Sequence, residues 1–225
     1  DHDSPDSPPM RRTLAFLLLT LLPSPVLAQD WTRFRGPNGS GVSAAKDLPA
    51  TLDRTKDLRW RTALAPGHSS PVLTRETVFT TGADAEALIV SAHALADGKV
   101  RWERRLVRAR TQEVYPANGS AAPTPCTDGT NVYAFFPELG LVSFDAAGQE
   151  RWRLALGPFV SFYGMASSPI LAGDTLVLLC DQQQGSFLLG VDCASGKQRW
   201  RTERSGLIEC WTTPILQPAA NPSSI

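Results

Sequence analysis

The chain has 225 residues, of which 42% are apolar and 20% charged, a composition that is typical of a globular protein and excludes an intrinsically disordered one. Lysine plus arginine and aspartate plus glutamate number 22 each, so the formal net charge is zero, and no excess of basic charge indicates a nucleic-acid partner. The 18 prolines and 17 glycines favour turns and β structure.

The N-terminus carries the pattern of a signal peptide over residues 10–28. Two arginines precede an apolar run from 14 to 22, and the segment ends on small residues at Ala28, which predicts cleavage after Ala28. The run is shorter than the ~20 residues that cross a bilayer, so no transmembrane helix is expected after cleavage. We therefore expect an exported protein of the bacterial periplasm or extracellular space. Residues 1–9, which precede Met10, are interpreted as a non-native upstream extension.

Four Arg-Trp pairs recur at intervals of about 45 residues and indicate internal repeats. The pairs end at Trp60, Trp102, Trp152 and Trp200. The last three tryptophans each stand four residues after a glycine, at Gly98, Gly148 and Gly196. A second series, Ser or Thr followed by Pro, runs in phase with the first, at positions 70, 124, 168 and 213. Two series in phase indicate one repeated structural unit.

Each repeat contains short strand-like segments separated by turn residues. Glycine combined with Asp or Ser at 96–98, 128–129, 173–174 and 195–197 predicts hairpin turns. The predicted strands cover 76–81, 88–95, 131–136, 141–145, 176–180 and 187–192. A repeat of about 45 residues with four short strands makes one blade of a β-propeller. The sequence therefore predicts an all-β propeller of four-stranded antiparallel blades, with about four blades present.

The repeated tryptophans and glycines are interpreted as structural. A broad indole ring can cover a glycine turn of a neighbouring sheet. We therefore expect blade-to-blade docking by Trp60, Trp102, Trp152 and Trp200 with Gly98, Gly148 and Gly196.

The segment 189–200 (LGVDCASGKQRW) resembles the repeat of pyrroloquinoline-quinone (PQQ)-like β-propellers, also called quinoprotein-like propellers. The opening segment 31–41 (WTRFRGPNGSG) is similar to the start of exported members of that family. The resemblance covers residues 29–216 and implies a seven- or eight-bladed whole, of which these residues form a part. Residues 217–225 then form a truncated or irregular tail. We expect a native protein about twice this long, and a fragment that self-associates through uncovered blade faces.

Two functions follow from the resemblance. The first is a non-catalytic binding or scaffold protein of the cell envelope, similar to BamB-type outer-membrane assembly factors, with no cofactor and with other envelope proteins or a small ligand as partners. The alternative is an alcohol or sugar dehydrogenase that depends on PQQ and calcium. The sequence lacks adjacent cysteines and a Cys-x-x-Cys-His haem attachment site, which favours the first function.

No catalytic or metal-binding residues are predicted. Five polar residues near predicted strand ends are weak candidates for facing the central channel, although solvated loop positions are the simpler interpretation: Glu113, Tyr115, Asn118, Asp181 and Glu209. The four cysteines are expected to be mostly free, buried thiols. In particular, hairpin pairing is expected to place Cys180 opposite about residue 188, which excludes a bond to Cys193.

Overall fold

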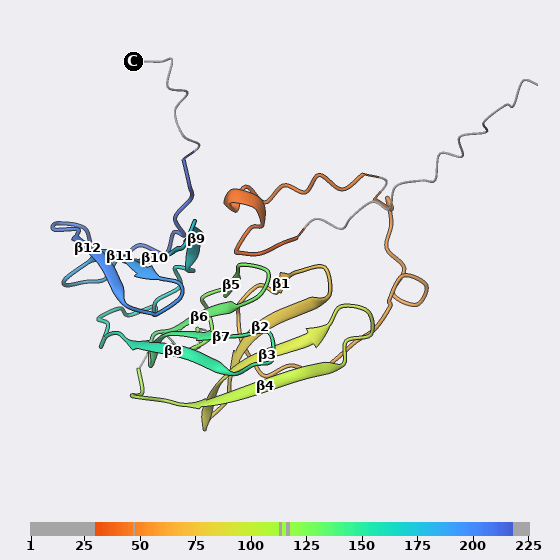
Figure 1. Cartoon of the computed structure of the whole chain (residues 1–225), viewed down its shortest axis with the longest axis horizontal. Helices are drawn as coiled ribbons and strands as arrows, with labels where there is room; N and C mark the ends of the chain where they lie inside the picture. Colours follow the sequence, from red (N-terminus) through yellow and green to blue (C-terminus); the bar gives the residue numbers. More distant parts are fainter. Residues whose placement is uncertain (1–29, 47, 113, 116–117, 218–225) are drawn as a thin grey trace, which may run out of the picture.

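A computed structural model describes residues 30–46, 48–112, 114–115 and 118–217 (Figure 1). The predicted signal peptide, the upstream extension, Glu113 and all of the predicted tail except Gln217 lie outside these residues. In the described part, no helix is long and apolar enough to cross a membrane.

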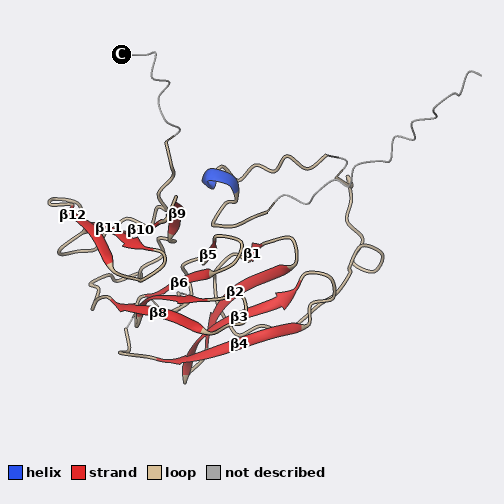
Figure 2. Cartoon of the chain, viewed as in Figure 1, coloured by secondary structure: helices blue, strands red, loops and turns tan. Residues whose placement is uncertain are grey.

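Three four-stranded sheets, each antiparallel and each formed by consecutive strands, make up the described part (Figures 1 and 2). A single 3₁₀ turn, Pro37–Gly39, precedes them. The first sheet contains β1 (Val72–Leu73), β2 (Thr77–Ala83), β3 (Ala87–Ala94) and β4 (Val100–Val107). The second contains β5 (Cys126–Thr127), β6 (Val132–Phe136), β7 (Gly140–Phe144) and β8 (Glu150–Ala155). The third contains β9 (Ile170–Ala172), β10 (Thr175–Cys180), β11 (Phe187–Asp192) and β12 (Gln198–Glu203). This architecture confirms the predicted all-β class and the part-propeller.

The described residues form three complete sheets, whereas the sequence predicted about four blades. Four Arg-Trp pairs and four Ser/Thr-Pro sites recur, but they stand at opposite edges of a sheet. The first pair, Arg59-Trp60, precedes every described strand, and the last Thr213-Pro214 follows the last strand. The first Arg-Trp pair and the last Thr-Pro pair therefore each mark part of a repeat and not a complete four-stranded sheet. Counting the repeated motifs alone did not reveal this difference.

The hairpin between the third and fourth strands has the same form in all three sheets. Its glycine has a positive φ, at +72° in Gly98, +76° in Gly148 and +71° in Gly196, a conformation that costs glycine little. The strand pairing shifts by one residue beside each of these turns, after Ala92, Ser143 and Gly190. A bulge at this point increases the local twist, and its repetition shows that the sequence repeat encodes one hairpin geometry.

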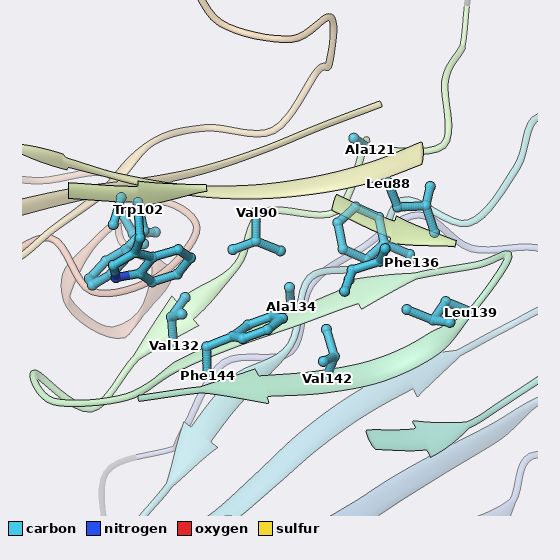
Figure 3. Close-up of a cluster of buried hydrophobic side chains, with 14 residues drawn as sticks. Leu88, Val90, Trp102, Ala121, Val132, Ala134, Phe136, Leu139, Val142 and Phe144 are labelled. Atoms are coloured by element: carbon cyan, nitrogen blue, oxygen red, sulfur yellow. The ribbon is translucent and has the colours of Figure 1, made fainter. Parts of the chain in front are cut away.

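The middle sheet is buried on both faces, which explains the continuous apolar run at residues 132–136. In β6, Val132, Ala134 and Phe136 face the first sheet, and Figure 3 shows them opposite Leu88, Val90 and Trp102. The alternate residues Tyr133 and Phe135 pack with the third sheet. Side chains of successive strand residues point to opposite faces, so a strand between two sheets has no polar side.

The segment before the first sheet crosses the inner edges of the sheets. Trp31 and Leu73 of β1 exchange two backbone hydrogen bonds of 2.9 and 2.8 Å, and the Thr127 N–H of β5 donates to Thr32 O at 2.9 Å. Further along, the Arg33 guanidinium donates to Pro214 O at 2.8 Å, and Asn38 exchanges two hydrogen bonds with the backbone of Leu216. This segment therefore joins the first and second sheets to the end of the repeat array.

The four cysteines are free, as expected from the sequence. Cys126 and Cys180 are buried, whereas Cys193 and Cys210 are only half-buried. Cys180 pairs with Phe187 in the hairpin, one residue from the expected position. Burial raises the pKa of the Cys126, Cys180 and Cys193 thiols, so that they stay protonated at neutral pH.

Candidate functional site

An indole ring lies at each of the two joints between neighbouring described sheets, and Trp60, which precedes the first sheet, packs on that sheet in the same way. A Cβ atom added to the turn glycine of the next sheet would lie 2.5 to 2.6 Å from the ring, for the pairs Trp60 with Gly98, Trp102 with Gly148, and Trp152 with Gly196. Each indole Nε1 also donates to a carbonyl of that same turn at 2.9 Å, namely to Leu95, Ala146 and Cys193. Only glycine permits this close an approach.

Trp200 is placed differently from the other three. Its ring lies against Gly190 of its own sheet, and it is 38% exposed, compared with 7% for Trp102 and 8% for Trp152. The outer strand β12 is exposed along its whole length, whereas β4 and β8 each bury their tryptophan. The structure therefore shows three tryptophan–glycine joints and one tryptophan without a glycine turn among the described residues.

The second repeated series forms a hydrogen-bonded row along the inner edge. The Ser70 N–H donates to Thr124 Oγ1 at 2.9 Å, the Thr124 N–H to Ser168 Oγ at 3.0 Å, and the Ser168 N–H to Thr213 Oγ1 at 3.1 Å. We call these four residues the hydroxyl row. The hydroxyl oxygens of Thr124, Ser168 and Thr213 each accept the backbone N–H of the preceding member, so the series links consecutive repeats in one direction.

The loops that join one sheet to the next gather at one end of the sheets. The turn after each second strand and the connection after each fourth strand lie at the same end, because successive strands are antiparallel. These connections cover residues 108–125, 156–169 and 204–213. Loops on a rigid sheet scaffold commonly carry binding residues, and we call this end the loop face.

Four aromatic side chains from three connections meet on the loop face. Tyr115 lies 6.1 Å from Phe162 and 5.8 Å from Tyr163, measured between ring centroids, and Tyr163 lies 5.6 Å from Trp211. Phe162 and Tyr163 pack edge to face at 4.9 Å. Their exposed fractions run from 44% to 58%. These residues, the aromatic cluster, form a solvent-facing apolar surface.

Hydrogen bonds between the three connections hold the aromatic cluster in place. The Tyr115 N–H donates to Phe162 O at 2.9 Å, and Asn118 Nδ2 donates to Tyr163 O at 2.8 Å. The Phe162 N–H donates to Glu209 Oε1 at 2.8 Å, and Trp211 Nε1 donates to Gly164 O at 3.0 Å. Three of the weakly predicted residues, Tyr115, Asn118 and Glu209, therefore lie together here.

Asp181, the fourth described candidate, lies apart from the aromatic cluster. Its carboxylate accepts two hydrogen bonds from Arg204, of 2.8 and 3.2 Å, and its side chain is 2% exposed. The other buried carboxylate of the loop face, Glu138, is paired with Arg108. Both carboxylates are thus paired with arginines of the same chain, and these ion pairs hold the loops in place.

A cavity of about 320 Å³ opens beside the aromatic cluster. Its lining consists of Asn118, Ala122, Tyr163, Ala166 and Trp211. Two small alanines form part of the lining, and Tyr163 and Trp211 contribute aromatic walls. A second cavity, of about 420 Å³, lies beyond Phe162 and is lined by residues 110–112, 158–162 and 183.

The carboxylates of the loop face do not fit a calcium ion. Calcium takes six to eight oxygen ligands, but Asp181 and Glu138 are paired with arginines and Glu209 accepts a backbone N–H. Among the described residues, no group of three or more His, Cys, Asp or Glu side chains could hold a metal ion.

Sequence reasoning missed Phe162, Tyr163 and Trp211. They lie in connections of unequal length, at different distances from the following Ser/Thr-Pro site, so they are not part of either repeated series. The available signal was their position: aromatic residues in connections that a blade topology places at one end of the sheets.

Comparisons with known proteins agree on the fold. A family model described as outer membrane protein assembly factor BamB matches residues 41–213, which is more than half of the chain. No curated protein matches by sequence.

Three solved structures are similar to this chain. A europium-containing methanol dehydrogenase is 12% identical with a TM-score of 0.56, covering 79% of this chain and 32% of its own. A quinohemoprotein alcohol dehydrogenase from Pseudomonas putida HK5 is 17% identical with a TM-score of 0.57, covering 78% and 26%. BamB from Moraxella catarrhalis is 20% identical with a TM-score of 0.43, covering 64% and 38%. The chain thus spans well under half the length of each structure, and the likeness shows the fold alone.

Proposed function

Because this chain belongs to the β-propeller family described as outer membrane protein assembly factor BamB, we propose that it is an exported, non-catalytic protein of the cell envelope that binds another protein. Envelope location is supported by the predicted signal peptide at residues 10–28 and by the family. The proposal includes no quinone or calcium.

The aromatic cluster is the observation that carries this proposal. Tyr and Trp are enriched at the centres of protein interfaces, because their rings bury large apolar areas while losing little conformational entropy. Tyr115, Tyr163 and Trp211 are about half exposed, and backbone hydrogen bonds fix the loops that carry them. A pre-organised surface of this kind avoids the ordering cost of binding.

We rank the alternative, a PQQ- and calcium-dependent dehydrogenase, below the binding function. Fold alone does not determine function, and the acids of the loop face are committed to arginines and backbone groups. The likeness to the dehydrogenases named above, at 12% and 17% identity, concerns the fold alone.

Site-specific photo-crosslinking in living cells tests the proposal. A photo-reactive amino acid replaces Phe162, which is 58% exposed in the aromatic cluster. A matched protein carries it in place of Val107, which is 80% exposed at the end of the outer strand β4. We expect irradiation to link an envelope protein to position 162 and not to position 107.

Cell fractionation is done together with the crosslinking, so that the envelope location and the binding through the aromatic cluster are tested separately. Recovery of the protein in the cytoplasm would contradict the envelope location. Equal adducts from both positions, or none from position 162 in a fully expressed protein, would contradict binding through the aromatic cluster.

A further inference from the structure

The cavity beside the aromatic cluster indicates what kind of group the partner inserts. Its five lining residues are Asn118, Ala122, Tyr163, Ala166 and Trp211, none of which carries a charge. Glu209, whose carboxylate contacts the aromatic cluster, accepts the Phe162 N–H. Burying an unpaired charge in such a lining would be costly, so charge complementarity selects an uncharged group.

The ring angles distinguish an inserted side chain from a stacked sugar. Tyr163 and Trp211 are inclined at 79°, and Phe162 and Tyr163 at 85°. A sugar ring stacks on a broad, flat aromatic face, whereas these rings are in edge-to-face contact with one another, and Tyr163 and Trp211 line the cavity beside that contact. The cavity of about 320 Å³ has room for one or two aliphatic or aromatic side chains.

One polar atom at the cavity suits a polypeptide main chain. Asn118 Nδ2 donates to Tyr163 O, and no hydrogen-bond donor to Asn118 Oδ1 lies among the described residues. Because Asn118 is one of the residues that line the cavity, this carbonyl oxygen can accept one backbone N–H of a segment bound there. An apolar cavity with a single placed acceptor is the usual form of a selective pocket.

We propose that the Tyr163–Trp211 cavity receives an uncharged apolar side chain from an extended segment of the partner protein, whose backbone N–H donates to Asn118 Oδ1. This inference rests on the proposed binding function and names the chemistry of its contact. The partner contributes an anchor residue such as leucine or phenylalanine, with charged residues excluded from that one position.

Selection from a displayed library of random dodecapeptides tests this inference on the full chain. Counter-selection uses the Ala166→Leu variant, in which the added methyl groups fill the cavity and leave the aromatic rings in place. Ala85→Leu is the matched control, because Ala85 is an exposed residue of the same loop face outside this cavity. Thermal unfolding of all three proteins checks that they fold equally.

We expect selected peptides to share one central apolar position and to lose about tenfold or more in affinity, by calorimetry, on its change to Asp or on Ala166→Leu. Ala85→Leu should bind as the parent protein does. Trp211→Ala, which removes one wall, gives a second measurement if Ala166→Leu unfolds. No enrichment over the Ala166→Leu protein, charged residues at the shared position, or binding of chito-oligosaccharides in place of peptides would overturn the inference.

The two proposals fail separately. If crosslinking from position 162 succeeds while Ala166→Leu leaves peptide binding intact, the partner uses the rim of the aromatic cluster and the cavity inference alone is wrong. If crosslinking fails while peptides bind the cavity, binding in the envelope is wrong and the pocket remains.

Discussion

At the scale of single residues, the turn glycines are held to glycine by two separate effects. Gly148 has a φ of +76°, and a Cβ atom added to it would lie 2.6 Å from the Trp102 ring. Gly185 has nearly the same φ, +74°, and no atom within 4 Å of an added Cβ. Comparing Gly148 with Gly185 therefore distinguishes the cost of backbone strain from the cost of displacing the tryptophan ring.

Alanine substitution at these two glycines should give different losses of stability. Gly185→Ala should lower the free energy of unfolding by about 1–2 kcal/mol, the cost of a left-handed conformation. Gly148→Ala should lower it by about 1–3 kcal/mol more, because the indole ring must move. Urea unfolding followed by circular dichroism gives both values. Equal losses would contradict a docking role for Trp102.

Tyr133 should make the protein less stable in alkali. Its pKa is raised in the folded state, first by burial and second by its hydrogen bond of 2.7 Å to Asp128. The unfolded chain ionises near pH 10 while the folded one stays protonated, so the free energy of unfolding falls as the pH rises above about 10. Below that pH the contribution is fully present.

The Tyr133→Phe variant tests this pH dependence. Near pH 8 it should be less stable than the parent by about 0.5–1.5 kcal/mol, because a hydrogen bond is lost. Above pH 10 the difference should shrink, since phenylalanine cannot ionise. A difference that stays constant or grows in urea titrations up to pH 11 would show that the Tyr133 hydroxyl does not differ between the two states.

At the scale of elements, the hydroxyl row ties each inner strand to the next. Thr124 is 2% exposed, and its Oγ1 accepts the Ser70 N–H at 2.9 Å. Thr124→Val keeps the shape and leaves that N–H unsatisfied, which should cost about 1–3 kcal/mol. Thr124→Ser keeps the hydroxyl and should recover most of this loss. Thermal unfolding of the two variants checks the prediction, and equal midpoints would contradict it.

The second and third strands of each sheet were predicted from the sequence, whereas the first and fourth strands were not. Phe187–Asp192 was predicted to the residue and β6 to within one residue, because apolar runs end there at glycine and aspartate turns. The outer strands β4, β8 and β12, which contain three of the Arg-Trp pairs, were not among the predicted strands. Two-residue inner strands such as β1 and β5 have no periodicity of their own, and they form only because a neighbouring strand pairs with them.

At the scale of the whole molecule, the repeat predicted the joints better than the binding surface. The same Trp and Gly types recur at fixed spacing because every joint has the same geometry. The aromatic cluster combines Tyr115, Phe162, Tyr163 and Trp211 from three unequal loops, and no periodic signal marks such a set. Tyr115 was among the weak candidates only because it lies near a strand end.

The roles of the two described acidic candidates could likewise not be predicted from the sequence. Asp181 and Glu209 were both considered for the central channel, but their partners decide what they do. Arg204 neutralises Asp181, and the Phe162 N–H engages Glu209. Both partners are distant along the chain or lie in another loop, so the fold had to be known before either role could be assigned.

The central claim, that this propeller binds and does not catalyse, is tested most directly by titrating PQQ in the presence of calcium. The titration uses the longest gene product that contains these 225 residues, with quinone absorbance and dye-linked oxidation of alcohols and sugars as the two readouts. We predict no saturable quinone binding and no oxidation above that of a heat-denatured sample. Binding of one equivalent of quinone with turnover would contradict the account and make the protein a dehydrogenase.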